Sequence, residues 1–281
     1  MNPASLSDQP PALRLQWSGL TDRGRFRANN EDSFLALAFD AREVRYLGKI
    51  GDAVLDGWDF VFAVSDGMGG EKSGEFASKI AVEKITRLLP RAFKLSAENL
   101  AAGFGDILAE LFHEIHREMT KLSESYEECR NMGATLSLAW FTPQWMYFAH
   151  IGDSRIYFLP KDGPMKQITH DHSQLGWMRR AGQINEREHR THPARNRLNQ
   201  SLGAGHRMLE PHVGAVGLQP GDRFALVTDG VVDGLWDRAI EEHLREPLPG
   251  QEGRTPAQRL VLTAVEESGR DNTTAVVVEV L

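Results

Sequence analysis

Apolar residues along the chain follow two spacings, and each change of spacing separates one predicted element from the next. A short alternating or continuous apolar run predicts a strand, whereas apolar residues three and four positions apart predict a helix. Strands are predicted at residues 13–20, 33–39, 60–64, 134–141, 145–151, 156–159, 213–216, 223–228 and 273–280. Helices are predicted at residues 76–89, 100–122, 171–181 and 257–267, with Pro90 ending the first and Thr255 capping the last.

Three segments depart from this regular pattern. Residues 40–57 are mixed and punctuated by glycine, which predicts a long hairpin connection without a defined pairing. Glycines predict a loop at residues 65–70, directly after a strand. Residues 178–207 hold seven arginines and no lysine, which is typical of a helix-poor surface lobe. The order of the elements favours one α+β layered domain at residues 13–281, preceded by a flexible tail at residues 1–12.

Composition narrows the class of protein. Of 281 residues, 41% are hydrophobic and 25% are charged, which excludes a mainly disordered or coiled-coil chain. One cysteine, Cys129, excludes an internal disulfide and a cysteine-built metal site, so a cytoplasmic location is expected. No apolar run approaches the roughly 20 residues that span a bilayer, and residues 1–13 lack the pattern of a signal peptide. The net charge of −7 argues against nucleic acid as a partner.

Five carboxylates lie where a predicted strand meets a turn: Asp32, Asp66, Asp153, Asp229 and Asp271. If the strand before Asp229 and the last strand are antiparallel neighbours, Asp229 and Asp271 share one edge of a sheet. Crowded carboxylates repel unless they are protonated or bridged by a cation, and ligand sets made only of oxygen suit Mg²⁺ or Mn²⁺. The alternative is that Asp-Gly pairs such as Asp66-Gly67 and Asp229-Gly230 form only turns.

Eight short motifs, taken together and in order, resemble the metal-dependent protein phosphatases of the type 2C class, in particular their bacterial branch. Each motif alone is weak, but the series spans most of the chain. The motifs are Gly24 to Ser33, Val64 to Gly70, Ser73 to Ser78, Gly133 to Leu136, Ile151 to Tyr157, Thr169 to Ser173, Val227 to Gly230 and Arg270 to Thr274.

This resemblance implies a four-layer αββα sandwich, with two antiparallel sheets flanked by helices. It implies that Asp66 bridges two Mn²⁺ or Mg²⁺ ions and that the carbonyl of Gly67, together with Asp229 and Asp271, completes their ligands. Asp32 would hold a metal-bound water with Glu31 in support, Arg27 would bind the substrate phosphate, and Asp153 would help to hold a third ion. A flap segment beside the active site is expected at about residues 176–207.

The implied activity is hydrolysis of phosphorylated Ser/Thr proteins by a metal-activated water, without a phosphoenzyme. The protein would act as a monomer and would oppose a bacterial Ser/Thr kinase in signalling. Met68 stands where eukaryotic relatives place a proton-donating His, which leaves the general acid unassigned. Two alternatives stay open: a catalytically weak phosphoprotein-binding regulator of the same fold, and a metal-dependent hydrolase of small phosphate esters or nucleic acid.

Overall fold

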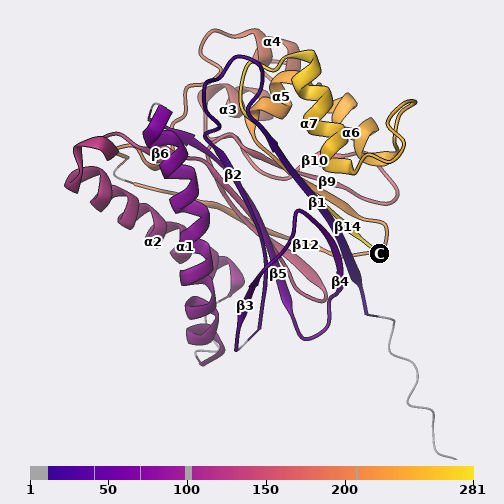
Figure 1. The fold of residues 1–281 in the computed structure, drawn as a ribbon, viewed down its shortest axis with the longest axis horizontal. Helices are drawn as coiled ribbons and strands as arrows, with labels where there is room; N and C mark the ends of the chain where they lie inside the picture. Colours follow the sequence, from indigo (N-terminus) through magenta and orange to yellow (C-terminus); the bar gives the residue numbers. More distant parts are fainter. Residues whose placement is uncertain (1–11, 41, 70, 99–102, 207) are drawn as a thin grey trace, which may run out of the picture.

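Four layers make up the protein, in the order helices, sheet, sheet, helices (Figure 1). The computed structural model describes residues 12–40, 42–69, 71–98, 103–206 and 208–281. The αββα sandwich is thus confirmed, while the predicted tail lies outside the described residues except for Ala12. Among the residues described, no helix is both long and apolar enough to cross a membrane.

Two antiparallel sheets form the centre of the molecule, and every pairing within them is antiparallel. The six-stranded sheet has the order β10 (Lys166–Gln167), β9 (Arg155–Leu159), β13 (Arg223–Val227), β14 (Thr273–Val280), β1 (Arg14–Asp22) and β4 (Ile50–Val54). The eight-stranded sheet has the order β11 (Leu202–Gly203), β6 (Gly133–Ala134), β5 (Asp59–Met68), β7 (Leu136–Phe141), β8 (Trp145–Ile151) and β12 (His212–Gly217), with β2 (Asp32–Phe39) joining β5 to β3 (Val44–Tyr46).

Helices cover the outer face of each sheet. The apolar sides of α1 (Glu71–Glu98) and α2 (Phe104–Ser125) pack on the eight-stranded sheet, and a short 3₁₀ helix, Glu127–Cys129, follows them. The six-stranded sheet is covered by α5 (Asp229–Gly234), α6 (Asp237–Arg245) and α7 (Pro256–Glu267). Two further helices, α3 (Gln174–Arg180) and α4 (Glu186–Thr191), lie above one end of the sandwich (Figure 1).

A layer of aromatic and branched side chains holds the two sheets together. Phe224 of β13 is fully buried between them, with its ring centroid 5.4 Å from that of Phe141 and 5.0 Å from that of Phe158. Trp17 lies 5.8 Å from Phe62 in the same layer. Because this layer uses residues from both sheets, it determines how their strand ends meet.

One predicted helix end is wrong. α1 continues through Pro90 to Glu98, so Pro90 does not end it; proline removes one helical hydrogen bond and can bend a helix without stopping it. Residues 40–57 connect β2 to β5, which are antiparallel neighbours, so the predicted long hairpin connection is confirmed. Within this connection, β3 pairs with β2 in one sheet and β4 pairs with β1 in the other. This segment therefore crosses between the sheets, which local spacing alone does not reveal.

Removal of the Phe224 ring tests the packing between the sheets. Phe224→Ala should lower the free energy of unfolding by about 3–5 kcal/mol, because a fully buried aromatic ring leaves a cavity among well-packed neighbours. Urea unfolding followed by circular dichroism measures this loss. Leu262→Ala, at a partly exposed position on α7, is the control and should cost less than about 1 kcal/mol. Equal losses in the two variants would contradict the role given to this layer.

Candidate metal centre

A cavity of about 370 Å³ opens where strand ends of both sheets meet. β5 carries Asp66 to its wall, and Asp229 begins α5 two residues after the end of β13. The lining residues are Arg27, Glu31, Asp66, Gly67, Met68, Gly69, Asp153, Asn196, Leu198, Asp229 and Asp271. The structure therefore brings together in one cavity every predicted site residue except Asp32.

Asp66 is held by a strand and not by a loop. β5 continues beyond its predicted end to Met68, and Asp66 lies opposite Asp32 of β2. The backbone NH of Asp66 donates to Oγ1 of Thr135 at 3.0 Å, and the Asp66 carbonyl accepts from the Thr135 NH at 2.9 Å. The prediction of a loop at residues 65–70 is wrong for Ser65 to Met68, because Ser65 and Asp66 pair with β2, and Gly67 and Met68 pair with β6.

Gly67 occupies a position that no side chain would fit. Its backbone NH donates to the carbonyl of Glu31 at 3.2 Å, and it pairs with Ala134 of β6. A Cβ atom at this position would collide with the carbonyl oxygen of Gly74, near the start of α1. The close contact between β5 and α1 thus explains the glycine directly after Asp66.

Asp229 and Asp271 reach the cavity from two neighbouring strands. β13 and β14 are antiparallel, with Val227 opposite Ala275, and the NH of Thr228 donates to the carbonyl of Thr274 at 3.0 Å. The end of β13 and the start of β14 therefore lie at the same edge of the sheet. The predicted placement of the two carboxylates at one edge is confirmed.

Asp32 lies behind the cavity wall and is buried between the two sheets. Its Oδ2 accepts hydrogen bonds from the hydroxyl groups of Thr228 and Thr274, each at 2.7 Å. Its Oδ1 has no hydrogen-bond partner among the described residues. Burial raises the pKa of Asp32 to about 7, although the two threonine donors favour the ionised form.

The carboxylates that line the cavity oppose one another's ionisation. Burial, and next the charge of Asp229, raise the pKa of Asp66 well above its ordinary value. Burial, and next the charge of Asp153, raise the pKa of Asp229 in the same way. Burial and the charge of Asp171 raise the pKa of Asp153 to about 7, although the charge of Arg155 favours ionisation. At neutral pH such a group is either partly protonated or in need of positive charge.

Arg27 supplies one positive charge at the rim of the cavity. Its Nη2 donates to Oδ2 of Asp271 at 2.6 Å, and about half of its side chain is exposed. This hydrogen bond raises the pKa of Arg27, so its guanidinium stays charged. A planar guanidinium at an open rim can also bind two oxygens of a phosphate.

The donor set fits a hard divalent cation. Its side-chain donors are carboxylate oxygens, and Oδ1 of Asp229 is a buried atom without a hydrogen-bond partner in the described part of the chain. Among the described residues, however, no three acidic, His or Cys side chains already converge as a ligand set. The ligand roles of Asp66, Gly67, Asp229 and Asp271, and those of Asp32 and Asp153, stay predictions.

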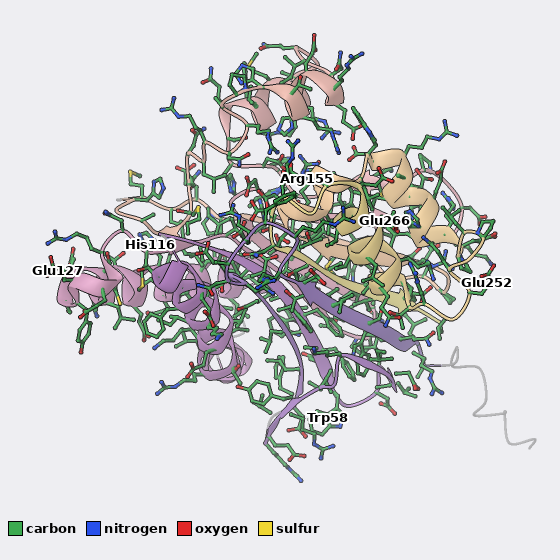
Figure 2. All side chains as sticks on the ribbon, turned by 45° about the horizontal axis from the view of Figure 1, so that its top comes forward. Trp58, His116, Glu127, Arg155, Glu252 and Glu266 are labelled. Carbon is green, nitrogen blue, oxygen red and sulfur yellow. The ribbon has the colours of Figure 1, made fainter. Side chains whose placement is uncertain are left out.

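A buried ion pair supports the strand next to Asp153. Arg155 of β9 donates through Nη2 to Oδ2 of Asp171 at 2.7 Å and through Nε to Oδ1 at 3.0 Å. Burial opposes ionisation of Asp171, but the charge of Arg155 holds its pKa below the ordinary value. Figure 2 shows Arg155 where the lobe of α3 and α4 meets the body of the protein. This pair therefore joins the base of the flap segment (residues 176–207) to the strand that follows Asp153.

The apolar pattern and the motifs missed several residues around the cavity. Asn196 and Leu198 of the flap segment form part of its wall. Asn272 accepts from the NH of Glu31 at 2.7 Å and donates to the carbonyl of Asn29 at 2.9 Å. Only the position of Asn272 next to Asp271 signals such a role in the sequence. For Asn196 and Leu198 the sequence predicted only that a flap segment would lie beside the active site.

Comparison with known proteins agrees with this fold. The family model of protein phosphatase 2C matches residues 49–261. The chain is 32% identical to the serine/threonine protein phosphatase PstP of Mycobacterium tuberculosis over 96% of its own length, and it spans a little under half, 46%, of that relative. It is 31% identical to the serine/threonine phosphatase stp of Listeria innocua, over 92% of this chain and 93% of that protein.

Solved structures show the same fold. The PstP catalytic domain in complex with two manganese ions has a TM-score of 0.70 and 29% identity, and the match covers 96% of this chain and 99% of that one. The serine/threonine phosphatase of S. agalactiae has a TM-score of 0.73 and 26% identity, with 94% and 99% covered. On the family model, the identities and the shared fold, the chain belongs to the protein phosphatase 2C family.

Proposed function

We propose that this chain is a metal-dependent phosphatase that hydrolyses phosphoserine and phosphothreonine in proteins, with two Mn²⁺ or Mg²⁺ ions and in some states a third. The observation that carries the proposal is the presence of Asp66, Asp153, Asp229 and Asp271 in one cavity beside Arg27. The relatives named Ser/Thr phosphatases and the two manganese ions of the PstP catalytic domain support it. A binder without turnover has no need of so many mutually repelling carboxylates.

The residues around the cavity would have separate roles in such a reaction. Asp66, Asp229, Asp271 and the carbonyl of Gly67 would hold the cations, with Asp153 reserved for the third. When bound, divalent cations lower the pKa of water and offset negative charge on phosphoryl oxygens. Arg27 would orient the phosphate through its planar fork. The thioether of Met68 in the cavity wall cannot donate a proton to the leaving group.

We further propose that residues 13–281 form one catalytic domain which acts in the cytoplasm as a monomer and opposes a Ser/Thr kinase. One free cysteine, Cys129, is in keeping with a reducing compartment. The names of the bacterial relatives support phosphorylated proteins as the substrate class.

Loss of a predicted ligand should abolish turnover without unfolding the protein. Asp66→Asn and Asp229→Asn should each lower kcat for p-nitrophenyl phosphate by at least about 100-fold, because charge that holds the cations is lost at almost constant volume. Assays with EDTA, Mn²⁺ and Mg²⁺ measure this effect, and circular dichroism checks the fold.

Asp56→Asn is the matched control, since it makes the same chemical change at an exposed position outside the cavity. It should turn over like the wild type. Unchanged turnover in Asp66→Asn would refute the proposed ligand set, and no metal-dependent turnover in the folded wild type would refute the proposed function.

Arg27 should contribute to transition-state binding. Arg27→Ala should lower kcat/KM for p-nitrophenyl phosphate by about tenfold or more, because charge-assisted hydrogen bonds to the phosphoryl oxygens are lost. Arg27→Lys should recover only part of this loss, since an ammonium group lacks the planar fork. Full recovery by lysine would show that only the charge matters.

Without cations, stability should fall as pH rises. The raised pKa values of Asp32, Asp66, Asp153 and Asp229 mean that these four carboxyl groups hold more protons in the folded state than in the unfolded state between about pH 4 and 7. Ionisation on raising the pH through this window therefore destabilises the fold. Histidines whose pKa values are lowered by burial act in the opposite direction, so the contribution of the carboxyl groups is measured against a variant that lacks one of them. In EDTA, Tm should be lower at pH 7.5 than at pH 5, and millimolar Mn²⁺ at pH 7.5 should restore it.

Asp66→Asn separates this effect from other titrations. The amide cannot ionise, so the fall in Tm and the gain from Mn²⁺ should both be smaller than in the wild type. The same dependence of Tm on pH and the same Mn²⁺ effect in both proteins would contradict the raised pKa of Asp66 and its proposed role as a cation ligand.

A further inference from the structure

A second cavity lies beside the carboxylate cavity, within the flap segment and its base. Its volume is about 410 Å³, which is in the range of ligand sites. Leu175, Met178 and Leu198 give it an apolar floor, and the exposed side chains of His192 and Arg197 form part of its rim. Leu198 lines both cavities, so the two are adjacent.

The floor of this second cavity is built on fixed backbone. Ser173 forms a β-bridge with Leu198, and the NH of Asn199 donates to the carbonyl of His172 at 2.7 Å. The Ser173 hydroxyl also caps α3 by accepting from the NH of Gly176 at 3.0 Å. A site that is formed before its ligand arrives loses less conformational entropy on binding.

The arginines of the flap segment divide into two groups. Arg179 pairs with Asp237 and Arg195 pairs with Asp233, so these side chains fasten the flap segment to the body, in line with the expected pairing with nearby acids. Arg190 donates to the carbonyl of Asp233 at 2.9 Å and lies over the ring of Trp236. Arg197, by contrast, is exposed and makes no ion pair with any described carboxylate.

We infer that this second cavity is a subsite for the substrate polypeptide, and that it accepts an apolar side chain and an acidic side chain a few residues from the phosphorylated one. The apolar floor would pack against the apolar side chain, and the guanidinium of Arg197 would pair with the acidic side chain. The shared wall at Leu198 places both next to the carboxylate cavity, which Arg27 also lines. Figure 2 shows many nitrogen-bearing side chains on the lobe of α3 and α4, which agrees with an acidic ligand.

This inference rests on the proposed function, since it names which phosphoproteins the site prefers. Its test must therefore be separate from turnover. The probes are fluorescent peptides that carry a non-hydrolysable phosphonate analogue of phosphothreonine. In one series a Leu and a Glu lie N-terminal to the analogue, in a second series they lie C-terminal to it, and in the matched peptides both are Ala.

Fluorescence anisotropy with the wild-type protein and Mn²⁺ measures Kd for each peptide. The Leu-Glu peptide should bind about tenfold more tightly than its Ala counterpart in one of the two series. Arg197→Glu should remove about fivefold of that preference, and the loss should shrink at high salt. Met178→Ala should weaken the contribution of Leu by about threefold and leave the salt dependence unchanged.

Arg187→Glu is the matched control, because Arg187 is an exposed arginine of α4 that does not line this cavity and makes no ion pair with a described carboxylate. It alters the net charge equally and should leave the preference intact. Equal binding of Leu-Glu and Ala peptides in both series, or an equal loss in Arg187→Glu and Arg197→Glu, would overturn the subsite.

Turnover of p-nitrophenyl phosphate separates the two proposals, since this substrate carries no flanking residues. It should be unchanged in Arg197→Glu and Met178→Ala. If the wild type fails to hydrolyse it while the peptide preference holds, the proposed function falls and the subsite stands. If hydrolysis occurs and the peptide preference is absent, the proposed function stands and the subsite is refuted.

Discussion

One buried carboxylate joins the two sheets at the edge where the site lies. Asp32 belongs to the eight-stranded sheet, and its Oδ2 accepts from Thr228 and Thr274, which belong to the end of β13 and the start of β14 in the other sheet. The strand partner of Asp32 is Asp66, and the next residue after Thr228 is Asp229. The spacing between the cavity carboxylates therefore depends on these two hydrogen bonds, which would be lost if the sheets slid apart.

Such an arrangement has an energetic cost that the rest of the fold must offset. Carboxylates with raised pKa values and two buried oxygens without partners destabilise a protein in the absence of cations. The aromatic layer around Phe224 and Phe62, directly between the sheets, provides compensating apolar burial. The apolar burial between the sheets therefore offsets the repulsion between the carboxylates at one edge of the sandwich.

The sequence predicted the parts of the site that follow from local pattern. Asp229 and Asp271 lie together because antiparallel pairing of two apolar strands places an end and a start on one edge. The loop predicted at residues 65–70 was wrong for Ser65 to Met68 because these residues pair with β2 and β6, which are distant in sequence. The short helices α5 and α6 were not predicted, since the Asp-Gly pairs of α5 also match a turn. The second cavity lies where Ser173 forms an isolated β-bridge with Leu198, and such a bridge has no local signature.

The flap segment is attached to the same helix that begins with a predicted ligand. Asp229 is the first residue of α5, while Arg190 and Arg195 hold the other end of that helix through the carbonyl and carboxylate of Asp233. The buried pair of Arg155 and Asp171 fastens the base of the flap segment to the strand after Asp153. The helix α5 and the strand after Asp153 therefore help to fix both the position of the flap segment and the positions of the cavity carboxylates. Arg197 alone among the described flap arginines lines the second cavity, so its guanidinium is available to a ligand bound next to the carboxylate cavity.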